Sequence, residues 1–242
     1  MSTATFPRLP IVDALRGFAV AQMIVYHFIY DLNYFGWVKL AMTRDQPWVG
    51  WRTAIVTQFL LLVGASLVLR LARKPDWGDF WCRWAQVAAA AALVSLASWL
   101  MFGPRFIYAG ILHFIAVALV VARLLAPLRE FNFALAAAAF AAWWLLRDAA
   151  YNAFPAHLLG FVTVKPRTED YVPLFPWIAA VLAGLGLGSA WQRRGFALAP
   201  SLRRFDARPP RLLLFLGRWP LTVYLAHQPI LIGLLWLVTK LA

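Results

Sequence analysis

Residues 11–32 read IVDALRGFAVAQMIVYHFIYDL, an apolar run interrupted by Asp13, Arg16, His27 and Asp31. A helix needs roughly 20 mostly apolar residues to cross the hydrocarbon core of a bilayer, and this run is long enough for one crossing. Its buried polar residues and the absence of a small-residue cleavage site argue against a cleaved signal peptide. Ionisable groups inside a membrane are costly and usually mark a functional site. The stretch therefore predicts a first membrane-spanning helix that carries chemistry.

The rest of the chain has the same apolar character. Of its 242 residues, 63% are apolar and 14% are charged, whereas a soluble domain is about half apolar and a quarter charged. Seven apolar runs stand out, at 11–32, 51–72, 80–102, 106–126, 131–147, 174–192 and 212–239. We therefore expect one all-α domain over residues 1–242, a polytopic bundle of about seven transmembrane helices in a lipid bilayer.

Basic residues dominate the charge, with a formal net charge of +13. They lie between the apolar runs, so we read them as topology signals and expect no nucleic-acid partner. With the N-terminus inside, the inner segments carry 13 Lys and Arg residues and the outer segments carry 8. The inner set is Arg8, Arg70, Arg73, Lys74, Arg83, Arg123, Arg129, Arg193, Arg194, Arg203, Arg204, Arg208 and Arg211. This bias predicts a cytoplasmic N-terminus and a C-terminus on the far side of the membrane, which for a bacterial inner membrane is the periplasm.

The single cysteine and a pair of glycines are the next features of the sequence. The single cysteine, Cys82, permits neither an internal disulfide nor a thiolate metal cage, and we expect no metal site. Gly184 and Gly188 spell part of a nucleotide-binding loop but lie inside an apolar run. Small residues at this spacing instead predict a close helix-packing face.

The outer segment 148–173 is the longest non-apolar loop on its side of the membrane. Its charged residues could meet a polar acceptor, or the segment could be a solvated connector. These residues are Asp148, Lys165, Arg167, Glu169 and Asp170. His157 has no distinctive neighbours in the sequence, and we expect it to be exposed.

Polar residues inside the apolar runs are the candidates for catalysis. Asp31 follows His27 by four residues, a spacing at which helical side chains meet, so the carboxylate could orient the imidazole as a base. The alternative is a polar pair that only holds helices together. His113 in the fourth run lies at the same predicted depth as His27, and the two rings either face each other or His113 is a packing residue.

The last run contains Tyr224-Leu225-Ala226-His227-Gln228-Pro229. Pro229 has no N–H for the carbonyl of Leu225, which predicts a kink and a free acceptor beside His227. Broken polar backbone at that depth usually borders a cavity. A plain proline kink with an interhelical hydrogen bond is the alternative.

These stretches together resemble membrane acyltransferases. Residues 12–19 followed by His27 reproduce the signature of integral-membrane acyltransferases, an Arg and a His separated by ten residues. Further segments resemble the heparan-α-glucosaminide N-acetyltransferase-like membrane family, particularly its short bacterial members. They are 59–67, 110–113, 173–177 and 216–230, which occur in family order across nearly the whole chain.

The resemblance implies an enzyme that moves an acetyl or other acyl group from cytosolic acyl-CoA to a hydroxyl or amine of a glycan or lipid-linked acceptor across the membrane. It implies His27 as the base or acyl relay, Arg16 as a donor-side or structural cation, and His113 and His227 as site-lining residues. Acyl-CoA is then a substrate, and no permanently bound cofactor is expected. The lysosomal relatives have Asn at the position of His27 and a later His, where residues 33–51 here have none.

A thioester is already activated, so the protein must mainly remove a proton from the acceptor and stabilise the developing negative charge. We expect His27, held by Asp31, to take the proton, with an acyl-His27 intermediate as the variant. The oxyanion would face a donor on protonated His113, Tyr224 or Gln228. The CoA phosphates would need cations at the inner face, where simple membrane anchoring is the alternative role: Arg70, Arg73, Lys74, Arg193 and Arg194.

Two other classes of protein stay open. A proton-coupled transporter would use the same buried His, Asp and Arg as a relay, but would tend to show broken helices in two corresponding repeats, and no repeat is visible. A haem or metal protein could use His27, His113 and His227, but no single helix carries a pair of suitably spaced histidines. A homodimer is compatible with the sequence.

Overall fold

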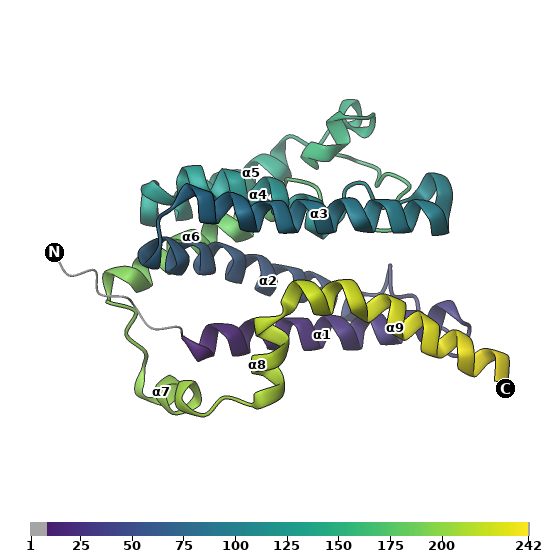
Figure 1. The fold of residues 1–242 in the computed structure, drawn as a ribbon. Coiled ribbons are helices and arrows are strands. Elements are labelled where there is room, and N and C mark those ends of the chain that lie inside the picture. The colour runs from purple at the N-terminus through teal and green to yellow at the C-terminus, as the bar shows by residue number, and fades with distance from the viewer. Residues whose placement is uncertain (1–8, 242) are drawn as a thin grey trace. The chain divides into compact units, whose positions relative to one another are not determined.

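The computed structural model describes residues 9–241, and its regular elements are all helices (Figure 1). The α-helices are α1 (Pro10–Tyr34), α2 (Gln46–Arg73), α3 (Trp77–Phe102), α4 (Ile111–Leu125), α5 (Asn132–Leu145), α6 (Trp177–Arg193), α7 (Pro200–Ala207), α8 (Arg211–Arg218) and α9 (Pro220–Leu241). Short 3-10 helices are η1 (Gly103–Arg105), η2 (Ala126–Phe131), η3 (Ala149–Asn152) and η4 (Ala156–Leu159). The prediction of an all-α membrane protein is confirmed.

Between residues 9 and 241, five helical stretches are long and apolar enough to cross a membrane. They are Pro10–Tyr34, Gln46–Arg73, Trp77–Arg105, Ile111–Leu145 and Pro220–Leu241. The fourth stretch contains a break, because Arg129 has a φ of 51° between α4 and α5. The apolar helix α6 has 17 residues, which corresponds to about 25 Å. The total of seven crossings stays a prediction.

The last predicted run, 212–239, does not form one helix. Instead, α8 ends at Arg218 and α9 begins at Pro220. Proline has no N–H to continue a helix and disfavours the helical conformation of the residue before it. Trp219 accordingly leaves the helical region, with φ of −119° and ψ of 41°. The membrane-spanning part of this run therefore begins at Pro220.

The described residues group into two compact units, with the boundary inside α2. The first unit comprises residues 60–197, and the second comprises 9–59 and 198–241. The expectation of a single domain stays a prediction.

Within the first unit, glycines allow α2 and α6 to touch along their backbones. A Cβ atom at Gly184 would lie 2.2 Å from the carbonyl oxygen of Leu61, and one at Gly64 would lie 2.1 Å from that of Val181. A Cβ at Gly188 would lie 3.0 Å from the side chain of Val68. The predicted helix-packing face at Gly184 and Gly188 is confirmed.

Within the second unit, α1 and α8 approach each other even more closely. A Cβ at Gly217 would lie 1.7 Å from the carbonyl oxygen of Asp13, and one at Gly17 would lie 1.9 Å from that of Leu213. This contact fixes the N-terminal half of α1, and the C-terminal half packs against α9 (Figure 1).

Successive residues along α1 contact successive residues along α8 and α9. Arg16 contacts Gly217, His27 contacts His227, and Asp31 contacts Gln228. The first and last long helices therefore run parallel. If both helices cross the membrane they cross it in the same direction, and a cytoplasmic N-terminus with a C-terminus on the far side stays a prediction.

Reporter fusions should test this arrangement. Fusions placed after Arg203 and after Ala242 are expected to report opposite compartments, because α9 would be the one crossing between them. The measurement is the activity of a reporter that works only in the periplasm and of one that works only in the cytoplasm. Finding both fusion points on the same side would contradict the arrangement.

Candidate active site

Four of the predicted site residues meet in the second unit, where α1 lies against α9. The ring centroids of His27 and His227 are 5.0 Å apart, with an angle of 64° between the ring planes. One turn further along α1, Asp31 Oδ1 accepts a hydrogen bond from Gln228 Nε2 at 3.4 Å. Residues about 200 positions apart in the sequence therefore form one polar cluster inside two apolar helices.

The hydrogen bond expected between His27 and Asp31 is not formed. His27 Nδ1 and Asp31 Oδ2 are both buried and have no hydrogen-bond partner. The ring of His27 instead packs edge-to-face against the rings of His227 and Tyr26. The centroids of the His27 and Tyr26 rings are 6.2 Å apart. A spacing of four residues brings two helical side chains near each other, but here the partners on α9 determine where each one points.

His227 has a defined tautomer. Its Nδ1 lies 2.5 Å from the carbonyl oxygen of Tyr224. A carbonyl only accepts, so Nδ1 carries the proton, and the neutral ring keeps a lone pair on Nε2. This Nε2 is buried without a hydrogen-bond partner. Downstream, α9 continues through Pro229 to Leu241.

Unpartnered polar atoms gather at this cluster. They are His27 Nδ1, Asp31 Oδ2, His227 Nε2 and Gln228 Oε1. Buried polar atoms in folded proteins nearly always have a hydrogen-bond partner, so an exception needs an explanation. Four such atoms on two adjacent helices make this cluster the candidate site for a polar ligand.

A second layer of polar residues supports this part of α1. Gln22 Nε2 donates to Gln58 Oε1 at 2.8 Å, and Trp51 Nε1 donates to Gln22 Oε1 at 3.2 Å. The ring of Trp51 also packs on that of Tyr26, with centroids 5.6 Å apart. Sequence reasoning missed these residues, although Gln22 and Gln58 are uncharged polar residues inside apolar runs and were visible as such.

A known protein family matches most of the chain. The family model described as Heparan-alpha-glucosaminide N-acetyltransferase, catalytic, matches residues 8–229, which include every predicted site residue. The chain belongs to this family. The activity that this description gives to the family is that of an N-acetyltransferase. No curated protein and no solved structure matches the chain.

In this N-acetyltransferase family member, Arg16 connects α1 to α8. Its Nη1 donates to Asp13 Oδ1 at 3.1 Å and to the carbonyl oxygen of Gly217 at 2.9 Å. Asp13 is only 4% exposed, and a buried carboxylate needs a compensating partner. The geometry favours the structural role for Arg16.

Arg16→Ala is therefore expected to destabilise the protein. Loss of a hydrogen-bonded charge should lower the stability by about 2 kcal/mol, or roughly 4–8 °C in melting temperature. Arg16→Lys should retain only part of the stability that Arg16 provides, because an ammonium group does not reproduce the planar guanidinium. Thermal unfolding in lipid or detergent measures the effect, with the exposed Arg44→Ala as control. An Arg16→Ala protein that melts like the Arg44→Ala control would contradict this role.

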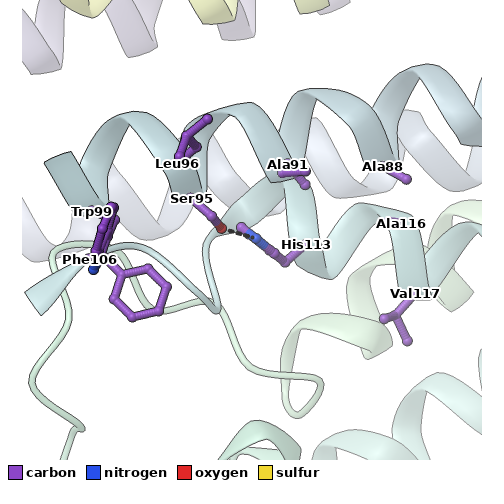
Figure 2. Close-up of a pocket in the computed structure, with 10 residues that line it drawn as sticks. Ala88, Ala91, Ser95, Leu96, Trp99, Phe106, His113, Ala116 and Val117 are labelled. Carbon is purple, nitrogen blue, oxygen red and sulfur yellow. Dashed lines mark hydrogen bonds between the residues drawn. The ribbon is translucent and has the colours of Figure 1, made fainter. Parts of the chain in front are cut away.

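His113 lies in the first unit, on α4 beside α3. Ser95 Oγ donates to the carbonyl oxygen of Ile107 at 2.8 Å and lies 2.8 Å from His113 Nε2. The hydroxyl has one proton, which goes to the carbonyl, so Nε2 of His113 donates to Ser95. Figure 2 shows this pair in an apolar groove. The lining includes Ala88, Ala91, Leu96, Trp99 and Val117. His27 belongs to the other unit, so the predicted facing of the two histidines stays a prediction.

Two of the arginines proposed for CoA phosphates have acidic neighbours in the first unit. Arg70, near the end of α2, forms an ion pair with Asp79 of α3. Arg193 Nε lies 3.4 Å from Glu130 Oε1. Arg73 lies in the last turn of α2. A phosphate would have to compete with Asp79 for Arg70.

The loop between α5 and α6 is held by the charged residues that were candidates for acceptor binding. Asp170 Oδ2 accepts from the backbone N–H of Ile111 at 3.0 Å, and Glu169 pairs with Arg105 at 3.4 Å. Asp148 accepts from the N–H of Ala150 at 2.8 Å. These contacts favour a structural role for the acidic residues of the loop.

The expectation that His157 is exposed is wrong. His157 is 5% exposed, and its ring contacts Tyr108, Phe154 and Tyr171, with centroids 5.6, 5.6 and 6.5 Å away. The hydroxyl of Tyr171 donates to the carbonyl oxygen of His157 at 2.6 Å, and burial raises the pKa of Tyr171 to about 12. Tyr108 and Tyr171, which are distant in sequence, pack on this histidine together with Phe154.

Metal binding finds no support in the described part of the chain. Between residues 9 and 241, no group of three or more His, Cys, Asp or Glu side chains is arranged to hold a metal ion.

Proposed function

We propose that this chain is a transmembrane acyltransferase that moves an acetyl group from acetyl-CoA to a hydroxyl or amine of a glycan or lipid-linked acceptor. The reacting centre is the His27–His227 pair. One observation carries the proposal: two adjacent membrane helices present buried polar atoms without partners, and two of these atoms are imidazole nitrogens. The match to an acetyltransferase family supports the type of reaction.

The reaction needs a base and a donor for the oxyanion. The acceptor oxygen or nitrogen attacks the thioester carbon, the new C–O or C–N bond forms, and the C–S bond breaks. His27 takes the proton that the acceptor loses and returns it to the sulfur of the departing CoA. The amide of Gln228, beside this pair, is a donor for the oxyanion.

His227 and Asp31 support His27 in different ways. Nδ1 of His227 donates to the carbonyl oxygen of Tyr224, so Nε2 of the neutral ring keeps a free lone pair. This lone pair can accept a hydrogen bond from the hydroxyl or amine that is to be acetylated. Asp31 lies one helical turn from His27, and its negative charge stabilises the imidazolium that forms there. Two imidazolium rings 5.0 Å apart would repel each other, so at most one of the two rings is positively charged at a time.

The two substrates would reach this centre from opposite faces. We place acyl-CoA at the cytoplasmic side and the acceptor at the periplasmic side. The distribution of Lys and Arg residues and the parallel course of α1 and α9 support this orientation.

Labelled acetyl-CoA tests the proposal. The purified protein in lipid is incubated with labelled acetyl-CoA and a panel of amino sugars, glycans and lipid-linked sugars. We expect release of CoA together with transfer of the label to one acceptor class. No CoA release across the panel, together with proton-driven uptake of a solute, would contradict the proposal and favour a transporter.

A further inference from the structure

A short basic helix, α7, plays no part in the proposed chemistry. It spans Pro200–Ala207 and reads PSLRRFDA. Leu202 and Phe205, three residues apart, share one face of the helix and are 45% and 37% exposed. Arg203 and Arg204 lie between them in the sequence. The helix therefore exposes apolar and basic side chains together.

A hydrogen bond fixes α7 at the start of α1. Asp206 Oδ1 accepts from the backbone N–H of Ile11 at 2.7 Å, and a carboxylate is favourable at a helix N-terminus. The 25 residues of α1 span about 38 Å, against roughly 30 Å for the hydrocarbon core. We therefore place the first turn of α1, and α7 with it, at the level of the lipid headgroups.

The charges of this segment are unbalanced. Asp206 is the one acidic residue between positions 200 and 211, and it is engaged by Ile11. The structure gives no acidic partner, within residues 9–241, to Arg203, Arg204, Arg208 and Arg211. Arg203 Nε donates to the carbonyl oxygen of Leu198 at 2.9 Å, which leaves its two terminal NH₂ groups available.

We propose that α7 is an interfacial helix that binds the headgroups of anionic phospholipids. Its arginines hold the phosphates, and Leu202 and Phe205 insert among the upper parts of the acyl chains. A lipid fits better than a free phosphate because the apolar surface continues onto α8. There, Leu212 is 66% exposed and Phe215 is 56% exposed.

Lipid retention tests the proposal, which does not depend on acyl transfer. A variant with Arg203→Gln, Arg204→Gln and Arg208→Gln is compared with a control that loses as many charges elsewhere: Lys39→Gln, Arg44→Gln and Arg167→Gln, all at exposed positions. Native mass spectrometry measures bound phosphatidylglycerol and phosphatidylcholine. We expect the α7 variant to retain at least fivefold less phosphatidylglycerol than the wild type and the control. Equal retention by the two variants, or displacement of the lipid by inorganic phosphate, would overturn the proposal.

A fluorescent probe tests the position of α7 independently. Phe205→Cys in a Cys82→Ser background is labelled with an environment-sensitive dye, and Arg44→Cys serves as the control site. In phosphatidylglycerol vesicles we expect a blue-shifted emission at position 205 that shallow spin-labelled lipids quench. A water-like emission at position 205, equal to that at position 44, would overturn it.

Discussion

Acetyl transfer should fall by at least about 100-fold when His27 is replaced by alanine, because a positioned general base contributes about 10²–10⁴ to a rate. The protein should stay folded, since His27 Nδ1 makes no hydrogen bond that the substitution would break. The measurement is CoA release and acetyl transfer in lipid by protein with an unchanged melting temperature. His227→Ala should also lower the rate strongly, because its Nε2 lone pair belongs to the same cluster.

Two further variants separate catalysis from packing. Asp31→Asn should lower the rate less than His27→Ala, because asparagine keeps an oxygen that can accept from Gln228 but loses the charge that stabilises an imidazolium. His157→Gln removes a buried histidine from the other unit and should leave turnover within a few-fold of the wild type. If wild type and His27→Ala release CoA at the same rate, His27 is not the base.

Gly217→Ala should unfold or severely destabilise the second unit. The added methyl group would meet the backbone carbonyl of Asp13 at 1.7 Å, and backbone cannot move aside as a flexible side chain can. We expect a loss of more than about 3 kcal/mol, seen as a large fall in melting temperature. Because α8 would separate from α1, acetyl transfer should be lost as well.

Two glycines of the same unit provide matched controls. No atom lies within 4 Å of a Cβ built at Gly50 on α2 or at Gly233 on α9. Alanine favours a helix interior over glycine by about 1 kcal/mol, so Gly50→Ala and Gly233→Ala should leave the melting temperature unchanged or raise it. If Gly217→Ala melts like these controls, the close contact between α1 and α8 is not a feature of the protein.

The apolar runs were sufficient to predict where the long helices lie, because membrane-spanning helices need long stretches without charge. The break between α8 and α9 was missed, although Pro220 carried the signal for it. The apolar residues on both sides made 212–239 look like one span. Hydropathy is averaged over many residues and does not register the effect of one proline on the backbone. The non-helical conformation of Trp219 shows where α8 ends and α9 begins.

The candidate site was predictable in its residues but not in its contacts. His27, Asp31, His227 and Gln228 stand out as polar residues in apolar runs, and the structure brings all four together. Their pairing was not predictable, since the spacing of His27 and Asp31 allows a contact without requiring it. Partners on α9, distant in sequence, determine the pairing. Arg16 likewise donates a hydrogen bond to the backbone carbonyl of Gly217, a residue with no polar side chain by which the sequence could indicate the contact.

A density map with a non-hydrolysable acetyl-CoA analogue bound in lipid tests the central claim most directly, because it locates the acyl group. We predict that the carbonyl carbon of the analogue lies beside the His27 and His227 rings. Its oxygen should be within hydrogen-bonding distance of a donor on α9. An analogue whose acyl group is held elsewhere, with neither histidine near it, would contradict the account.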